Sequence, residues 1–137
     1  MEERPFVYIC SPFRPISPSP KTELTINISL ARDACTLACY RGYTPIAPHL
    51  YFPQFLRDDM EAERKLGLSI GLQLISRCQE LWIVSRRISA GMSAEIKEAQ
   101  RAGVRVLVFT ADGFRRYAGT GDVTENCMKD TLDGVKN

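Results

Sequence analysis

The chain has 137 residues, of which 45% are hydrophobic and 25% are charged, with a formal net charge of +2 at pH 7. This size and composition predict one globular domain with its own core and leave little room for a second. Because 18 basic residues are balanced by 16 acidic ones, binding to a nucleic-acid polymer or a membrane surface is not expected, whereas small anions remain plausible ligands. No apolar stretch approaches the roughly 20 residues of a membrane span, and the N-terminus lacks a signal-peptide pattern. We therefore expect a cytoplasmic protein.

Short apolar runs alternate with helix-like segments along most of the chain. We predict strands at 5–10, 43–48, 79–85 and 104–109, and helices at 22–41, at 60–77 and after Ser89. The proline-rich segment 11–20 and the aromatic-rich segment 49–59 are predicted to be loops, and Gly42 suits the C-terminal cap of the first helix. Beyond Thr110 we expect a turn-rich stretch with a short helix. This alternation indicates an α/β domain at 1–112 with a parallel sheet, followed by a C-terminal extension at 113–137.

The five cysteines do not indicate a disulfide framework or a metal site. They are odd in number, and most lie in segments predicted to be core, so reduced thiols that pack as small hydrophobic side chains are expected. Cys35 and Cys39 are four residues apart on a predicted helix and could be joined by His49 in a metal site. No second C-x-x-C pair supports that hypothesis, and we expect neither a metal nor a cofactor.

In open parallel sheets, ligands bind beyond the carboxyl ends of the strands. That rule brings together the loops at 11–15, 48–55, 86–95 and 110–114. In the third of these, Ser89 is placed to cap a helix, and Gly91 falls in its first turn, where backbone N–H groups favour an anion. Many helices begin in this way without any ligand, so the pattern alone makes an anion site available without establishing one.

Glu95 lies on the same predicted helix, beside its apolar stripe. The stripe consists of Met92, Ile96, Ala99 and Gly103, and Glu95 is roughly 60–80° from its centre at a period of 3.6 residues. A carboxylate at such a border can be partly desolvated while still reaching a ligand, which suits a nucleophile or a general base. From position alone, a glutamate that extends to water is the commoner case.

Several other side chains are candidates with two interpretations each. His49 is either an acid, base or ligand contact, or a histidine bonded to loop backbone. A planar base could stack on aromatic rings that could equally pack the loops, namely Tyr8, Phe13, Tyr51, Phe52 and Phe55. Arg14 and Arg64 could pair with a phosphate or carboxylate, although surface arginines are commoner. Gly67 and Gly71 would let another backbone approach the second helix, and we favour plain packing for them.

Five segments carry a resemblance to a known superfamily. They are "VYICSPFRP" at 7–15, "NISLARDACTLACYRGYTPIAPHLYFPQFL" at 27–56, "ERKLGL" at 63–68, "CQELWIVS" at 78–85 and "ISAGMSAEIKEA" at 88–99. In this order, and over about residues 5–110, the chain resembles the nucleoside 2-deoxyribosyltransferase-like superfamily, in its small phage and bacterial branch. The resemblance implies a flavodoxin-like or Rossmann-like three-layer fold with a parallel sheet of four or five strands.

The resemblance also implies a reaction and a set of site residues. A helix glutamate, here Glu95, would attack the anomeric carbon of a nucleoside and form a covalent glycosyl-enzyme. The segment 8–14 would hold and protonate the base, through Tyr8, Ser11, Pro12, Phe13 and Arg14. Ser89, Gly91 and Met92 would lie near the 5′ end of the sugar, and the remaining ligand contacts would be His49, Tyr51 and Arg64. A homo-oligomer is implied as well.

Some positions depart from the transferases of this superfamily. Those transferases usually have an aspartate near the position that Ser89 occupies here, and a glycine at the position that Lys97 occupies. The spacing Ser-x-Gly-x-x-x-Glu is closer to the branch that hydrolyses nucleoside 5′-monophosphates. An acidic residue is common at Gln79, where neighbouring Glu80 could stand in for it. We therefore expect an enzyme that acts on the N-glycosidic bond of a nucleoside or nucleotide, by transfer or by hydrolysis. The alternative is a catalytically silent protein that binds a nucleotide derivative, and a third option is a purely structural domain.

Overall fold

The computed structural model describes residues 3–85, 87–110 and 113–116 as one five-stranded sheet with helices on both faces. The strand order is β2-β1-β3-β4-β5, and the strands are β1 (Phe6–Cys10), β2 (Thr44–Ile46), β3 (Glu80–Ile83), β4 (Arg105–Thr110) and β5 (Gly113–Arg116). The first four strands pair in parallel, and β5 pairs with β4 in the antiparallel direction. This is the flavodoxin-like order, which confirms the predicted fold class with four parallel strands.

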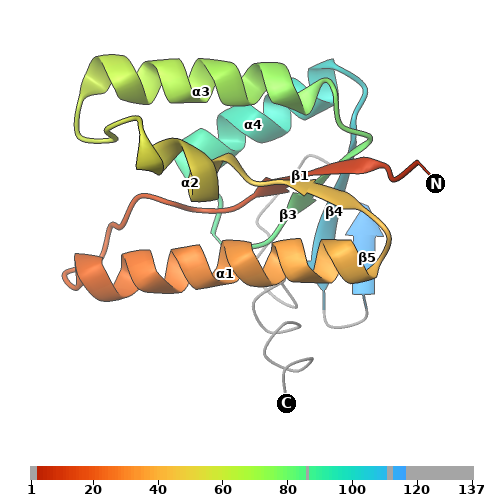
Figure 1. Cartoon of the computed structure of the whole chain (residues 1–137), viewed down its shortest axis with the longest axis horizontal. Coiled ribbons are helices and arrows are strands. Elements are labelled where there is room, and N and C mark those ends of the chain that lie inside the picture. The colour runs from red at the N-terminus through yellow and green to blue at the C-terminus, as the bar shows by residue number, and fades with distance from the viewer. Residues whose placement is uncertain (1–2, 86, 111–112, 117–137) are drawn as a thin grey trace.

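Helix α1 (Pro20–Tyr40) covers one face of the sheet, while α3 (Glu61–Ile75) and α4 (Ala90–Arg101) cover the other (Figure 1). Proline is favoured at the start of a helix because the first N–H groups have no intrahelical partner, which suits Pro20. Gly42 follows the α1 C-cap with a φ of 85°, as predicted for a glycine that ends a helix. The helices thus form a three-layer sandwich with the sheet.

The central strands β1, β3 and β4 bury both of their faces, and successive side chains point to opposite layers. Tyr8 and Cys10 of β1 belong to the core beneath α3 and α4, together with Ile75, Met92 and Ile96. The alternate residues of β1 belong to the core beneath α1, where Trp82 is fully buried. Thus α4, which carries Glu95, packs on the side of the sheet that Tyr8 faces.

Three local predictions were wrong. The segment 49–59 contains α2 (Pro48–Tyr51) and a short 3-10 helix (Phe52–Gln54) instead of a plain loop, since Pro48 begins a helical turn. Residues 113–116 form β5 by pairing with β4, where a turn-rich stretch with a short helix was expected. Gly103 is exposed with a φ of 74° and follows α4 instead of extending its buried stripe.

The proposed boundary at residue 112 stays a prediction, because most of the extension, residues 117–137, lies outside the described residues. Across the described part of the chain, none of the helices is both long and apolar enough to span a bilayer.

Candidate functional site

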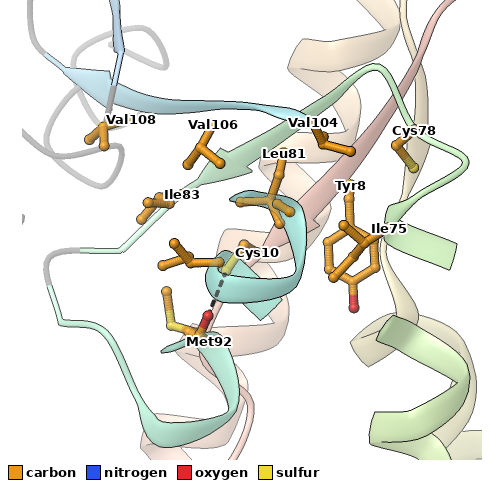
Figure 2. Close-up of a cluster of buried hydrophobic side chains, with 12 residues drawn as sticks. Tyr8, Cys10, Ile75, Cys78, Leu81, Ile83, Met92, Val104, Val106 and Val108 are labelled. Atoms are coloured by element: carbon orange, nitrogen blue, oxygen red, sulfur yellow. Dashed lines mark hydrogen bonds between the residues drawn. The ribbon is translucent and has the colours of Figure 1, made fainter. Parts of the chain in front are cut away.

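The site lies between the parallel strands β1 and β3, where the helix that follows the strand changes from one face of the sheet to the other. These neighbouring strands lead to helices on opposite faces, β1 to α1 and β3 to α4, and a crevice at such a switch point is the usual ligand site of this topology. There, the Tyr8 hydroxyl of β1 donates a hydrogen bond to Oε2 of Glu95 on α4. Cys10 Sγ lies 3.7 Å from Glu95 Oε1. It also lies 3.8 Å from the Met92 carbonyl oxygen (Figure 2). The two residues predicted to be catalytic, Tyr8 and Glu95, are therefore in direct contact.

Glu95 is almost completely buried, with 4% of its surface exposed, and Tyr8 is 1% exposed. Loss of hydration raises the pKa of Glu95 to about 7, against the opposing effect of the hydrogen bonds from Tyr8 and Cys10. Burial, followed by the charge of Glu95, raises the pKa of Tyr8 well above its ordinary value. Near neutral pH the tyrosine is thus a neutral donor, and the glutamate is divided between its ionised and protonated forms.

The start of α4 has the predicted cap. Ser89 Oγ accepts a hydrogen bond from the Met92 N–H at 3.2 Å, and Gly91 is exposed in the first turn with open space around its Cα. The first N–H groups of a helix have no intrahelical acceptor and carry the positive end of its dipole. The helix that buries Glu95 in its second turn thus presents a surface suited to an anion at its first turn.

The loop after β1 packs on the residues that follow β2. The Phe13 and His49 rings stack with centroids 5.4 Å apart and planes 20° apart, and Asn27 Nδ2 donates to the Phe13 carbonyl oxygen at 3.1 Å. Burial lowers the pKa of His49, although Asp58 and the Ser11 carbonyl favour its protonated form. His49 is therefore neutral near pH 7 and sits against loop backbone, as one of its two interpretations expected.

The other predicted ligand residues differ in exposure and in their contacts. Arg14 is paired with Asp58, with 3.2 Å between Nε and Oδ2. Ser11 is 1% exposed, and its hydroxyl has no hydrogen-bond partner among the described residues. Pro12 is buried, whereas Tyr51 and Arg64 are exposed. Within the described part of the chain, no hydrogen bond or ion pair joins Tyr51 or Arg64 to the Tyr8–Glu95 pair.

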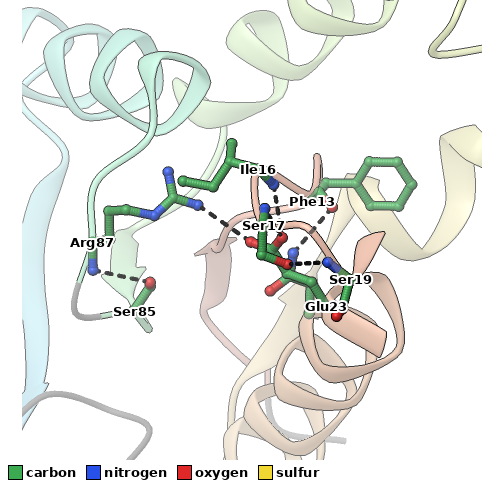
Figure 3. A network of polar contacts seen from close by, with 8 residues as sticks. Phe13, Ile16, Ser17, Ser19, Glu23, Ser85 and Arg87 are labelled. Atoms are coloured by element: carbon green, nitrogen blue, oxygen red, sulfur yellow. Dashed lines mark hydrogen bonds and ion pairs between the residues drawn. The ribbon is translucent and has the colours of Figure 1, made fainter. Parts of the chain in front are cut away.

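Sequence reasoning missed Glu23, which connects the loop after β1 with the loop before α4. Its Oε2 accepts hydrogen bonds from the N–H groups of Ile16 at 2.7 Å and Ser17 at 2.8 Å. Its Oε1 lies 3.9 Å from Nη2 of Arg87, in the loop before α4 (Figure 3). The backbone hydrogen bond from Ser17, the largest influence, lowers the pKa of Glu23. An acidic residue in the first turn of a helix after a Ser/Pro loop was the available signal.

Glu80 does not take part in this centre. It is the first residue of β3, at the opposite end of the strand from the loop that leads to α4. Its carboxylate accepts hydrogen bonds from Trp82 Nε1 at 2.9 Å and from Arg105. Glu80 therefore does not stand in for an acidic residue at Gln79. Among the described side chains, no group of three or more His, Cys, Asp or Glu is arranged to hold a metal ion.

Together, fold and site define a flavodoxin-like α/β domain with a buried tyrosine–glutamate pair at its switch point. The chain belongs to the family described as a domain of unknown function (DUF7768), which matches residues 5–109. No curated protein matches the sequence. Among solved structures, the chain is similar to a 2-deoxyribosyltransferase from the psychrotolerant bacterium Bacillus psychrosaccharolyticus, with a TM-score of 0.46 and 16% identity, covering 74% of this chain and 69% of that chain.

Proposed function

We propose that the protein cleaves the N-glycosidic bond of a nucleoside or nucleoside 5′-monophosphate, with Glu95 as the nucleophile. This proposal rests on the Glu95 carboxylate. It is buried, it accepts a hydrogen bond from Tyr8 at the switch point between β1 and β3, and its pKa is about 7. A structural carboxylate on the border of a helix face would extend to water, because burying it without an ion-pair partner is costly. Strongly shifted carboxyl groups in such a crevice are candidates for catalysis.

The proposed reaction proceeds in two displacements at C1′ of the sugar. In the first, ionised Glu95 forms a bond to C1′, the C1′–N bond breaks, and the base leaves with that electron pair and takes up a proton. In the second, water or the nitrogen of another base attacks C1′, the glycosyl ester breaks, and the incoming group loses a proton. Glu95 is regenerated, and the configuration at C1′ is retained. Hydrogen bonding by Tyr8 orients the carboxylate and holds part of it ionised at neutral pH.

The groups around Glu95 are assigned to the two ends of the substrate. The Ser89 and Gly91 turn of α4, with Met92 behind it, would take the 5′ end of the sugar, where a phosphate benefits from the free N–H groups. The loop from Ser11 to Arg14, stacked on His49 through Phe13, would take the base, with Tyr51 and Arg64 at the rim. Because Glu95 is 4% exposed, the sugar reaches it only when the loops after β1 and β3 separate.

We also propose that the protein is a homo-oligomer. Large apolar side chains are exposed along α2, the 3-10 helix and α3, namely Tyr51, Phe55, Met60, Leu66 and Leu68. Exposed large apolar side chains are candidates for burial in an interface between subunits. Sedimentation analysis of the wild type should give a mass of at least twice that of one chain, which is 15.4 kDa. The mass of a single chain at micromolar concentration contradicts the assembly.

Base release is the direct test of the proposed reaction. Wild type, Glu95→Gln and Glu98→Gln are incubated with a panel of nucleosides and their 5′-monophosphates, with and without a second base, and products are separated by chromatography. Glu98 is the matched control, because it lies on the same helix in an exposed ion pair with Arg101. Base release or exchange by wild type and Glu98→Gln, with loss of at least about a hundredfold in Glu95→Gln, supports the proposal. Nucleotide binding without base release by any variant supports a binding protein instead.

A further inference from the structure

The Tyr8 hydroxyl is enclosed between two helices. It donates to Glu95 on α4, and it also lies close to α3 at Gly71. A Cβ atom built on Gly71 would lie 3.0 Å from the Tyr8 oxygen, and among the described residues no other heavy atom outside the helix lies within 4 Å of it. The tyrosine ring beside this contact is packed among buried side chains that include Ile75 (Figure 2). The ring has little freedom to move away.

We propose that Gly71 is a positioning residue, whose missing side chain lets α3 hold the Tyr8 hydroxyl on the Glu95 carboxylate. The role of Gly71 in catalysis rests on the proposed function, whereas its effect on the position of the Tyr8 hydroxyl rests on packing alone. An added Cβ at 3.0 Å requires a shift of a few tenths of an ångström. Because the Tyr8 oxygen is rigidly attached to a ring that is buried in the core with β1, the ring and its oxygen must shift together, and this disturbs the geometry of the hydrogen bond to Glu95.

The same helix contains its own control. Gly67 lies one turn before Gly71, and a Cβ built there meets, among the described residues, only Leu56 at 3.5 Å and Phe52 at 3.6 Å, which are ordinary contacts. Glycine in a helix interior is less favourable than alanine. Gly67→Ala should therefore raise the melting temperature, as would Gly71→Ala if position 71 had no further role. The proposal expects the opposite sign at Gly71.

The test combines thermal unfolding with titration of Glu95. The carboxyl carbon of Glu95 is followed by NMR in glutamate-labelled protein and assigned through Glu95→Gln. Gly71→Ala should lower the melting temperature and raise the pKa of Glu95 above its value of about 7, in the same direction as Tyr8→Phe, because both weaken the hydrogen bond that favours the ionised form. Gly67→Ala should leave the titration unchanged.

The double variant Tyr8→Phe with Gly71→Ala separates positioning from general packing. Without the tyrosine oxygen the added methyl group has nothing to displace, so Gly71→Ala should raise the melting temperature in that background, as Gly67→Ala does in the wild type. If Gly71→Ala alone does not fold, rescue by Tyr8→Phe still supports the proposal, and failure of rescue overturns it. A stabilised Gly71→Ala with an unchanged Glu95 titration also overturns it. These readouts hold even if no variant releases a base, so failure of the proposed function is recognised separately.

Discussion

Cys10 Sγ lies 3.7 Å from Oε1 of Glu95, the carboxylate oxygen to which Tyr8 does not donate. One buried carboxylate is thus approached by a hydroxyl at one oxygen and by a thiol at the other, both from β1. Residues 8 and 10 of a strand point to the same face, so this arrangement follows directly from their spacing. Both groups are donors, and both favour the ionised form of Glu95.

Removing the thiol should therefore make Glu95 a weaker acid. We expect Cys10→Ala to raise the pKa of Glu95 above about 7, by less than Tyr8→Phe does, because a thiol is a weaker donor than a phenol. Carboxyl NMR titration measures the change, and the pH dependence of base release should move in the same direction. Cys78→Ala is the matched control, because Cys78 is also buried but donates to the Leu74 carbonyl. An equal effect of both substitutions contradicts a direct contact with Glu95.

Glu95 should make the fold less stable as the pH rises. Its pKa is about 7 in the folded state against an ordinary value of 4.5, so between these values the folded chain binds more protons than the unfolded chain, and the free energy of unfolding falls with increasing pH. In Glu95→Gln this fall in the free energy of unfolding is absent, because a glutamine side chain does not ionise. Its stability relative to wild type should rise from near zero at about pH 4 to about 3 kcal/mol at about pH 8.

Urea unfolding across this pH range measures the difference. Glu98→Gln should show no comparable rise, because Glu98 pairs with Arg101 at the surface and hydrogen bonding to Arg101 lowers the pKa of its carboxyl. A stability difference for Glu95→Gln that is independent of pH would mean that Glu95 is not desolvated in solution.

Glu23 should control access to the buried pair. Its carboxylate accepts hydrogen bonds from the N–H groups of Ile16 and Ser17 and forms an ion pair with Arg87, in the loop before α4. Glu23→Ala removes all three interactions, so we expect faster alkylation of the buried Cys10 thiol, followed by mass spectrometry of its peptide. Arg87→Ala should have a smaller effect, because its 3.9 Å contact is long and partly exposed.

Two comparisons guard this interpretation. Alkylation of Cys78, which precedes β3 at the other end of the sheet, should not change in Glu23→Ala. Asp59→Ala removes a surface carboxylate of an exposed ion pair with Arg57 and should leave Cys10 as slow as in the wild type. An unchanged Cys10 rate in Glu23→Ala would show that the crevice opens without releasing this connection.

The sequence predicted the elements whose signal is local. The apolar runs of β1, β3 and β4 and the periodicity of α1 and α4 specify their elements because each repeats its pattern over several residues. β5 was missed, since "GFRR" has no apolar alternation and its strand arises from pairing with β4. The 3-10 helix and α2 were missed because prolines and aromatic residues there resemble a loop.

The site was predictable only in part, for a related reason. Helical periodicity placed Glu95 near the buried stripe of α4, but its burial depends on Tyr8, which is 87 positions away in the sequence. The commoner interpretation, a solvated carboxylate, was wrong because α3 and β1 close over that border. Gly71 was predicted only as a position of close packing, and Glu23 was missed, since the partners of both become neighbours only through the tertiary fold.

Glu80 and Arg105 should give the fold a second, opposite dependence on pH. Glu80 is 5% exposed; burial favours its protonated form, but hydrogen bonds from Arg105, Trp82 and Tyr43 outweigh this and lower the pKa of the carboxyl. A lowered folded-state pKa contributes stability above the unfolded value of 4.5 that is lost as the pH falls through the folded value. Arg105→Ala should therefore cost about 1–3 kcal/mol at neutral pH, at the lower end because the arginine is half exposed.

That cost should shrink in acid, because protonated Glu80 no longer needs a cationic partner. Urea unfolding of Arg105→Ala and wild type at about pH 7 and about pH 3 measures it, and comparison of the two proteins at each pH cancels the contribution of Glu95. Arg101→Ala is the control, since it breaks a surface pair with Glu98 and should change stability little at either pH. If Arg105→Ala costs the same at both pH values, its effect comes from lost packing of the arginine stem and not from the buried carboxylate.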